Sequence, residues 1–189
     1  MQMTSPQTTA LMTVAMMVAM MLPSVAPTLW HHYLDLRAKG SPRPWQHTSL
    51  FAVGYASVWS AIGLMLFAID TVRPPVTPLA LGTGLLSAGA LQVSRWKARQ
   101  LLRCRRTCAT TARSTAKMAW RNGCRLGVAC SLSCAAAMVV LVVAGLMDTR
   151  VMLLVTTVIT AERLAPAGGH IARLSGTVAL IAGLSMVTR

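Results

Sequence analysis

Four long stretches of the chain contain no charged residue, and they constrain the fold more than any other feature of the sequence. They are residues 10–30, 48–69, 74–94 and 126–147. Apolar runs of about 18 or more residues are typical of helices that cross a lipid bilayer. The composition agrees, because charged residues make up 12% of the chain, whereas soluble globular domains carry about 25%. The sequence therefore predicts an all-α, polytopic membrane helix bundle that forms a single domain over residues 1–189.

We predict about six transmembrane helices, of which the last two rest on shorter uncharged runs than the others. Their expected bounds are residues 10–30, 49–69, 75–94, 125–147, 150–166 and 171–188. If the last two are interfacial or re-entrant, a four-span core remains. Five glycines in the second and third spans lie at positions suited to close helix contact. They are Gly54, Gly63, Gly82, Gly84 and Gly89.

The distribution of basic residues predicts the orientation in the membrane. The chain has 18 Lys and Arg against 4 acidic residues. With six spans, 15 of the basic residues fall on one face and 3 on the other, and ten of the 15 lie between residues 95 and 125. Cytoplasmic loops collect Lys and Arg. We therefore expect a multi-pass protein of the bacterial inner membrane, with both termini outside and a long basic cytoplasmic loop at residues 95–124. This orientation explains the charge of +14 without nucleic acid as a partner.

The first span is rich in methionine and is interrupted by proline. Met12, Met16 and Met20 are spaced four residues apart, so they share one helical face, and Met17 and Met21 form a second, adjacent pair. Two prolines, at 23 and 27, each remove a backbone donor and predict a kink or an unwound segment that faces the bundle interior. No basic residue precedes Arg37, so we expect this run to be kept as a span rather than cleaved as a signal peptide.

Sulfur is the donor atom that the sequence offers most often, with 13 Met and 5 Cys. Soft thiolate and thioether ligands select Cu(I), and thiolates also suit zinc. Cys130 and Cys134 are four residues apart on the fourth span, and Met20 and Met16 on the first span are the expected thioether ligands. Copper, as Cu(I), is the preferred metal and zinc is less favoured. The alternative reading is that these residues only pack, since methionine and cysteine are ordinary apolar fillers.

Two further features extend this candidate site. Glu162 lies within or beside the fifth span, where an ionisable residue is a functional hypothesis by default. It is expected to compensate charge or move a proton, or else to pair at the interface with Arg163, Arg125 or Arg173. Cys104 and Cys108 lie in the basic loop, where neighbouring arginines favour the thiolate.

The sequence shows no catalytic constellation. No phosphate-binding loop, dinucleotide fingerprint or catalytic triad is present, so we do not expect an enzyme. Asp70 and Asp148 are expected to cap turns beside Arg73 and Arg150 at the outer ends of helices.

Four segments resemble a family of predicted metal-binding integral membrane proteins, the domain of unknown function 2182. They are MMVAMMLPSVAP at 16–27, GALQVSRWKARQLLRCR at 89–105, WRNGCRLGVACSLSCAAAMVVLVVAGLMD at 120–148 and AERLAP at 161–166. The resemblance implies that Cys104, Cys130 and Cys134 match the cysteine pattern of the family. Gln100 and Ser133 stand where that pattern has two more cysteines.

We therefore predict a membrane protein that binds a soft metal and transfers or delivers it to a metalloenzyme partner. Cys130, Cys134, Met20 or Met16, and Glu162 would form the core site, and Cys104 and Cys108 would form a cytoplasmic transfer pair. The alternative is a non-catalytic accessory or assembly subunit packed in a larger membrane protein complex.

Overall fold

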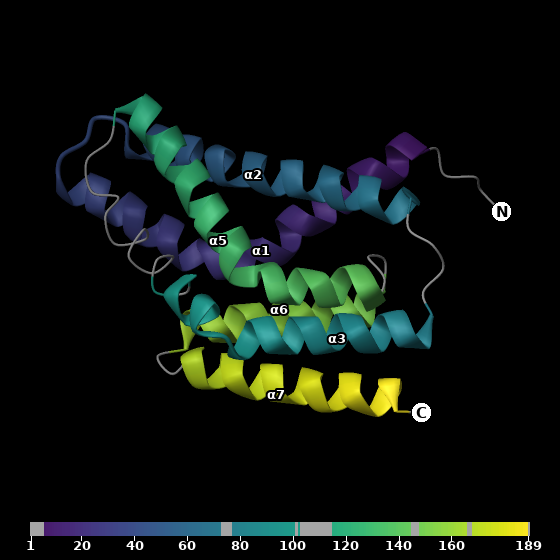
Figure 1. The fold of residues 1–189 in the computed structure, drawn as a ribbon. Helices are drawn as coiled ribbons and strands as arrows, with labels where there is room; N and C mark the ends of the chain where they lie inside the picture. The colour runs from purple at the N-terminus through teal and green to yellow at the C-terminus, as the bar shows by residue number, and fades with distance from the viewer. Residues whose placement is uncertain are drawn as a thin grey trace. The chain divides into compact units, whose positions relative to one another are not determined.

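The computed structural model describes residues 6–72, 77–100, 102, 115–144, 148–165 and 168–188, and nearly all of them are helical (Figure 1). The helices are α1 (Pro6–Ala38), α2 (Pro44–Val72), α3 (Pro78–Val93), α5 (Ala116–Ala144), α6 (Thr149–Leu164) and α7 (Gly168–Val187). Residues 95–100 are also helical. These described residues contain no strand, so the predicted all-α class is confirmed.

Four helices are long and apolar enough to cross a membrane. They cover Gln7–Ala38, Pro44–Val72, Ala116–Ala144 and Gly168–Val187. Helices α3 and α6 each have 16 residues. At a rise of 1.5 Å per residue each is about 24 Å long, which is less than a hydrocarbon core of about 30 Å. The apolar helices suit a membrane protein, while the number of six spans and the side of each terminus remain predictions.

Side-chain caps set where two of the shorter helices begin. The hydroxyl of Thr77 accepts a hydrogen bond from Ala80 N at 3.2 Å, and Pro78 follows in the first helical turn. The carboxylate of Asp148 accepts from Arg150 N at 2.9 Å, which confirms the expected cap at the start of α6. In contrast to the unwound segment considered from the sequence, α1 stays helical through both Pro23 and Pro27.

The chain forms two compact units. The first comprises Met1–Leu64 and Gln100–Leu132, and the second comprises Met65–Arg99 and Ser133–Arg189. In the first unit, helix backbones approach each other at glycines. A Cβ atom added at Gly54 would lie 2.5 Å from the carbonyl oxygen of Trp120, and one at Gly63 would lie 3.2 Å from the Cα of Val14. Helix α2 therefore packs closely against both α5 and α1.

The second unit uses the same device between α3 and α7. A Cβ atom at Gly82 would lie 3.2 Å from the carbonyl oxygen of Gly183, and one at Gly89 would lie 2.8 Å from that of Gly176. Because low numbers on α3 meet high numbers on α7, the two helices run antiparallel. Gly84 would meet Val143 of α5 at 2.6 Å. All five glycines predicted to mediate close helix contact do so.

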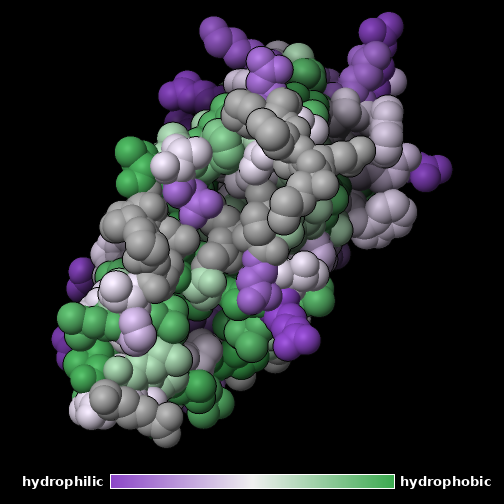
Figure 2. Space-filling model, turned by 90° about the vertical axis from the view of Figure 1, so that its right-hand side faces the viewer, coloured by the Kyte–Doolittle hydropathy of each residue, from purple (hydrophilic) through white to green (hydrophobic). Residues whose placement is uncertain are grey.

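Large apolar side chains remain exposed along the helices, and in Figure 2 hydrophobic side chains gather toward the lower left of the face that is drawn. Examples from different helices are Leu11, Leu79, Leu153, Val178 and Ile181, each more than 60% exposed. Soluble monomers rarely expose apolar patches of such extent. This surface suits a lipid environment.

We expect Gly123→Ala to lower the free energy of unfolding by about 1–3 kcal/mol. The new Cβ would clash with the carbonyl oxygen of Phe51, so α2 and α5 would have to separate. Thermal unfolding in detergent measures the change. Gly169→Ala is the matched control, since a Cβ there has nothing within 4 Å. Equal midpoint shifts for the two variants would contradict the close packing of α2 against α5.

Candidate functional site

The buried face of α1 carries three methionines. Met17 is 1% exposed, Met20 6% and Met21 0%, and Thr13 and Ser24 are buried with them. These positions recur every three or four residues, as one face of a helix requires. The structure therefore brings Met20 into the interior of the first unit. Met16 lies only partly buried beside this face.

Met17 and Met21 are the most deeply buried methionines of α1, whereas the thioether ligands preferred from the sequence were Met20 and Met16. The predicted face contains Met12, Met16 and Met20. Along it, burial decreases toward the N-terminus, from buried Met20 through Met16 to Met12, which is 60% exposed. A signal for the correct face was present in the sequence. Thr13 and Ser24 are polar residues in an apolar span, and polar residues in membrane helices face the bundle interior.

Cys130 on α5 is fully buried in the same unit, with 0% exposure. Its Sγ lies 3.3 Å from the hydroxyl oxygen of Tyr55 on α2, within hydrogen-bonding distance. Close packing at Gly127, where an added Cβ would lie 2.9 Å from Val58, holds α5 near this part of α2. A hydroxyl at this distance can donate to a thiolate and thereby stabilise the form of cysteine that binds soft metals.

Cys134 lies one turn further along α5 and belongs to the second unit. It is 2% exposed, and its Sγ is 3.8 Å from the hydroxyl oxygen of Ser133. Both predicted cysteines of this helix are therefore buried. The predicted transfer pair, Cys104 and Cys108, lies outside the described residues.

Glu162 is 2% exposed and belongs to an ion-pair cluster in the second unit. Its Oε2 lies 2.9 Å from Nζ of Lys97. Its Oε1 accepts hydrogen bonds from Nε2 of Gln92 and, at 3.2 Å, from the hydroxyl of Ser175. Lys97, which the sequence analysis did not consider, is thus an ion-pair partner of Glu162.

Lys97 also connects the cluster to α5, because its ammonium group donates to the carbonyl oxygen of Ser133. The sequence analysis placed Lys97 in the basic cytoplasmic loop, and its side chain is only 4% exposed. In this arrangement each oxygen of the Glu162 carboxylate already has a partner. The carboxylate therefore balances the charge of a buried ammonium group that belongs to the protein itself.

Within the described part of the chain, no three His, Cys, Asp or Glu side chains come together as a group that could hold a metal ion. Since thioethers are also soft ligands, a soft-metal site with three or more side-chain ligands in these residues would include methionine. The buried methionines of α1 and Cys130 meet that chemical requirement inside one unit.

A comparison with known families agrees with this donor chemistry. The model of the PpoB2 family, described as a copper chaperone, matches residues 10–186. The chain belongs to this family. The match covers nearly the whole chain and includes every sulfur and ion-pair residue described above. It associates the protein with copper, the metal that the sulfur ligands predicted. No curated protein and no solved structure matches the chain significantly.

We expect removal of either charge of the buried pair to destabilise this family member strongly. Lys97→Met and Glu162→Gln should each lower the free energy of unfolding by about 3–5 kcal/mol, because the remaining charge is left buried without its partner. The double variant should lose much less than the sum of the two. Thermal unfolding of the three variants in detergent gives this comparison.

Arg173→Gln is the control for these single and double variants, because Arg173 was a predicted partner of Glu162 and lies exposed on α7. It should unfold like the wild type. Additive losses in the double variant would show that Lys97 and Glu162 do not stabilise each other.

Proposed function

We propose that the chain is a membrane-embedded copper chaperone, which holds Cu(I) on buried sulfur atoms and delivers it to a copper-dependent enzyme. The observation that carries the proposal is the burial of four sulfur atoms in one unit. Met17, Met20 and Met21 of α1 and Cys130 of α5 are each 6% exposed or less. Membership of a copper chaperone family supports the same reading.

The chemistry of these donors suits a carrier. Thioether and thiolate sulfur prefer Cu(I) over hard cations such as Mg²⁺ or Ca²⁺. Methionine contributes no charge, and one thiolate balances the single charge of Cu(I), so the loaded site is neutral in an apolar interior where an uncompensated charge is costly. Such a site can bind the ion and release it to another sulfur or imidazole ligand.

Further parts of the chain extend this proposal. Cys134, one turn from Cys130 on α5, is a second thiol along the path of the ion. Cys104 and Cys108 are proposed as the transfer pair on the cytoplasmic side of the bacterial inner membrane. The recipient is proposed to be a metalloenzyme that depends on copper.

Cu(I) binding by the purified protein tests the proposal. Under reducing conditions in detergent, the wild type should bind Cu(I) close to stoichiometrically in competition with a chromophoric Cu(I) chelator. Met21→Leu and Cys130→Ser should each weaken binding at least about tenfold, or about 1.4 kcal/mol, because each removes one soft ligand.

Matched controls separate ligand loss from general disturbance. Met12→Leu changes an exposed methionine on the same helix, and Cys124→Ser changes a less deeply buried cysteine on α5. Both should bind Cu(I) like the wild type. If the wild type binds no Cu(I), the proposal is wrong, and an accessory subunit that copurifies with a larger complex becomes the favoured function.

A further inference from the structure

Helices α1 and α2 of the first unit are joined by a short turn with a defined geometry (Figure 1). The backbone N–H of Gly40 donates to the carbonyl oxygen of Arg37 at 3.1 Å, and that of Ser41 donates to the carbonyl oxygen of Leu36 at 3.1 Å. These two bonds form a Schellman motif, which needs a left-handed residue directly after the helix. Gly40 supplies it, with a φ of +68°. Helix α2 then begins at Pro44.

Three aromatic rings form a continuous row across this turn. Trp30 stacks on Tyr33 with the ring centroids 6.0 Å apart, and Tyr33 meets Trp45 of α2 edge-on at 6.3 Å. The two tryptophans are nevertheless largely exposed, Trp30 at 61% and Trp45 at 72%. Tryptophan and tyrosine combine an apolar ring with a polar tip, and they are enriched where the hydrocarbon of a membrane meets its head groups. The exposed row is therefore typical of a membrane interface.

The outer face of α1 changes from apolar to aromatic to cationic toward the turn. Pro23, Trp30 and Arg37 are spaced seven residues apart, so they lie in one row along the helix, and all three are exposed. Seven residues of helix span about 10 Å, and the head-group layer on each side of a bilayer is about 5–8 Å thick. Helical side chains lean toward the N-terminus of their helix. With the Trp30 ring at the edge of the hydrocarbon, the guanidinium group of Arg37 therefore falls among the head groups.

The turn also carries a positive charge. Residues 30–45 contain three Lys or Arg residues and one acidic residue, Asp35. Arg37 and Arg43 are exposed at the end of α1 and just before α2, and Nη1 of Arg43 donates to Oε1 of Gln46 at 3.5 Å. Basic residues beside a membrane surface attract anionic lipid head groups. Charge complementarity thus favours an anionic over a zwitterionic lipid at this turn.

The lengths of the two helices fit the same placement. A hydrocarbon core of about 30 Å takes about 20 helical residues. Counted back from Trp30 along α1 it ends near Ala10, and counted forward from Trp45 along α2 it ends near Leu64. Neither segment contains Asp, Glu, Lys or Arg. The aromatic row therefore lies where the uncharged part of each helix begins.

We propose that the turn between α1 and α2 is a binding site for an anionic phospholipid and anchors this end of the first unit at the membrane interface. Trp30, Tyr33 and Trp45 lie at the edge of the hydrocarbon. Arg37 and Arg43 bind the phosphate of the lipid. Residues 30–45 contain no sulfur atom, so this inference does not rest on the copper site.

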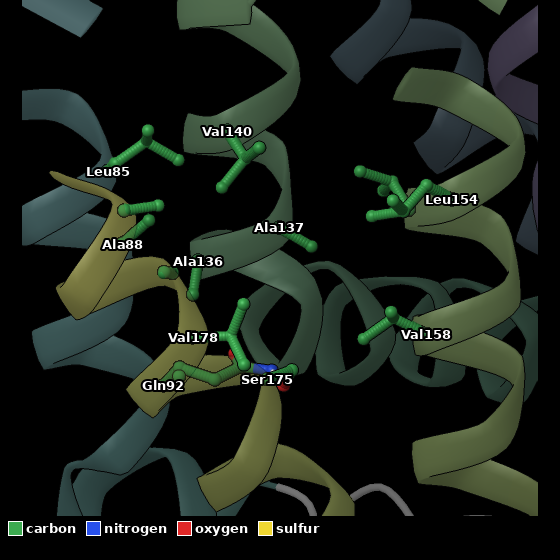
Figure 3. Close-up of a pocket in the computed structure, with 14 residues that line it drawn as sticks. Leu85, Ala88, Gln92, Ala136, Ala137, Val140, Leu154, Val158, Ser175 and Val178 are labelled. Atoms are coloured by element: carbon green, nitrogen blue, oxygen red, sulfur yellow. The ribbon is translucent and has the colours of Figure 1, made fainter. Parts of the chain in front are cut away.

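The pocket of the second unit lacks the groups that the turn offers (Figure 3). It has a volume of about 380 Å³, and its lining residues include no aromatic ring and no charged side chain. Its two polar residues, Gln92 and Ser175, lie together among aliphatic side chains. The residues that line this pocket are therefore expected to show no preference for an anionic lipid, and they provide an internal reference for the experiment.

Photolabelling of the full-length protein in phosphatidylcholine nanodiscs tests the proposal. The probe is phosphatidylglycerol with a diazirine near its head group, and labelled peptides are identified by mass spectrometry. We expect saturable labelling of residues 30–45. Unlabelled phosphatidylglycerol should compete with the probe, whereas the same fraction of phosphatidylethanolamine should not. Inorganic phosphate should not compete either, because the site takes a phosphate that belongs to a lipid.

Two double variants separate the site from the total charge. Arg37→Gln with Arg43→Gln should weaken labelling of residues 30–45 at least about tenfold, because each cation near the surface favours an anionic lipid about fivefold. Arg150→Gln with Arg173→Gln is the matched control, since it removes two exposed arginines from the second unit. It should label at residues 30–45 like the wild type.

The depth of the aromatic row is an independent readout. The emission of Trp30 and Trp45 is obtained as the difference between the wild type and a Trp30→Phe, Trp45→Phe variant. Brominated phosphatidylcholine should quench it more strongly with bromine near the head group than with bromine near the chain ends. The proposal is overturned if labelling does not saturate, if phosphatidylethanolamine or inorganic phosphate competes equally, or if the arginine variant labels like the wild type. Stronger quenching by the deep bromines, or none by either lipid, also overturns it.

Discussion

Close approach of helix backbones is the constraint on which both units depend. Lipid is as apolar as the helix surfaces, so burial of apolar area does not drive helices together in a bilayer, and contact has to come from tight packing and hydrogen bonds. Glycines supply that contact, with Gly54 against α5 in the first unit and Gly183 against α3 in the second. The distances that matter for chemistry follow from it. Tyr55 reaches Cys130 because α2 and α5 touch, and Gln92 reaches Glu162 in a unit where α3 lies directly against α7.

Sequence patterns predicted the features that depend on local physics. The apolar runs gave the helical class, the glycines gave the contact points, and Asp148 gave the start of α6. The patterns could not predict which face of each helix is turned toward the interior, or which residues pair across helices. Methionines recur so often in α1 that several faces satisfy a four-residue spacing, and only packing selects Met17 and Met21. Lys97 counted as one of ten loop charges, and nothing in its neighbourhood in the chain indicated a carboxylate on α6 as its partner.

The structure shows where the cysteine positions expected from the family resemblance lie in this chain. The family resemblance assigns two further cysteine positions to residues 100 and 133, and both side chains are buried here, Gln100 at 7% and Ser133 at 1% exposure. The carbonyl oxygen of Ser133 accepts a hydrogen bond from the ammonium group of Lys97. These positions are therefore interior whether or not they carry sulfur. The buried soft donors that remain include the thiols of Cys130 and Cys134 and the methionine thioethers of α1.

The Lys97–Glu162 cluster also imposes an order on the biogenesis of the protein. A chain is made from its N-terminus, and Gln92 precedes Glu162 by 70 residues. Lys97 is therefore synthesised before Glu162, and its ammonium group lacks this carboxylate partner until α6 has been made. Helix α3 itself is uncharged, and Lys97 lies four residues after its last residue, Val93. The complete ion-pair cluster of the second unit can therefore form only after α6 has been synthesised.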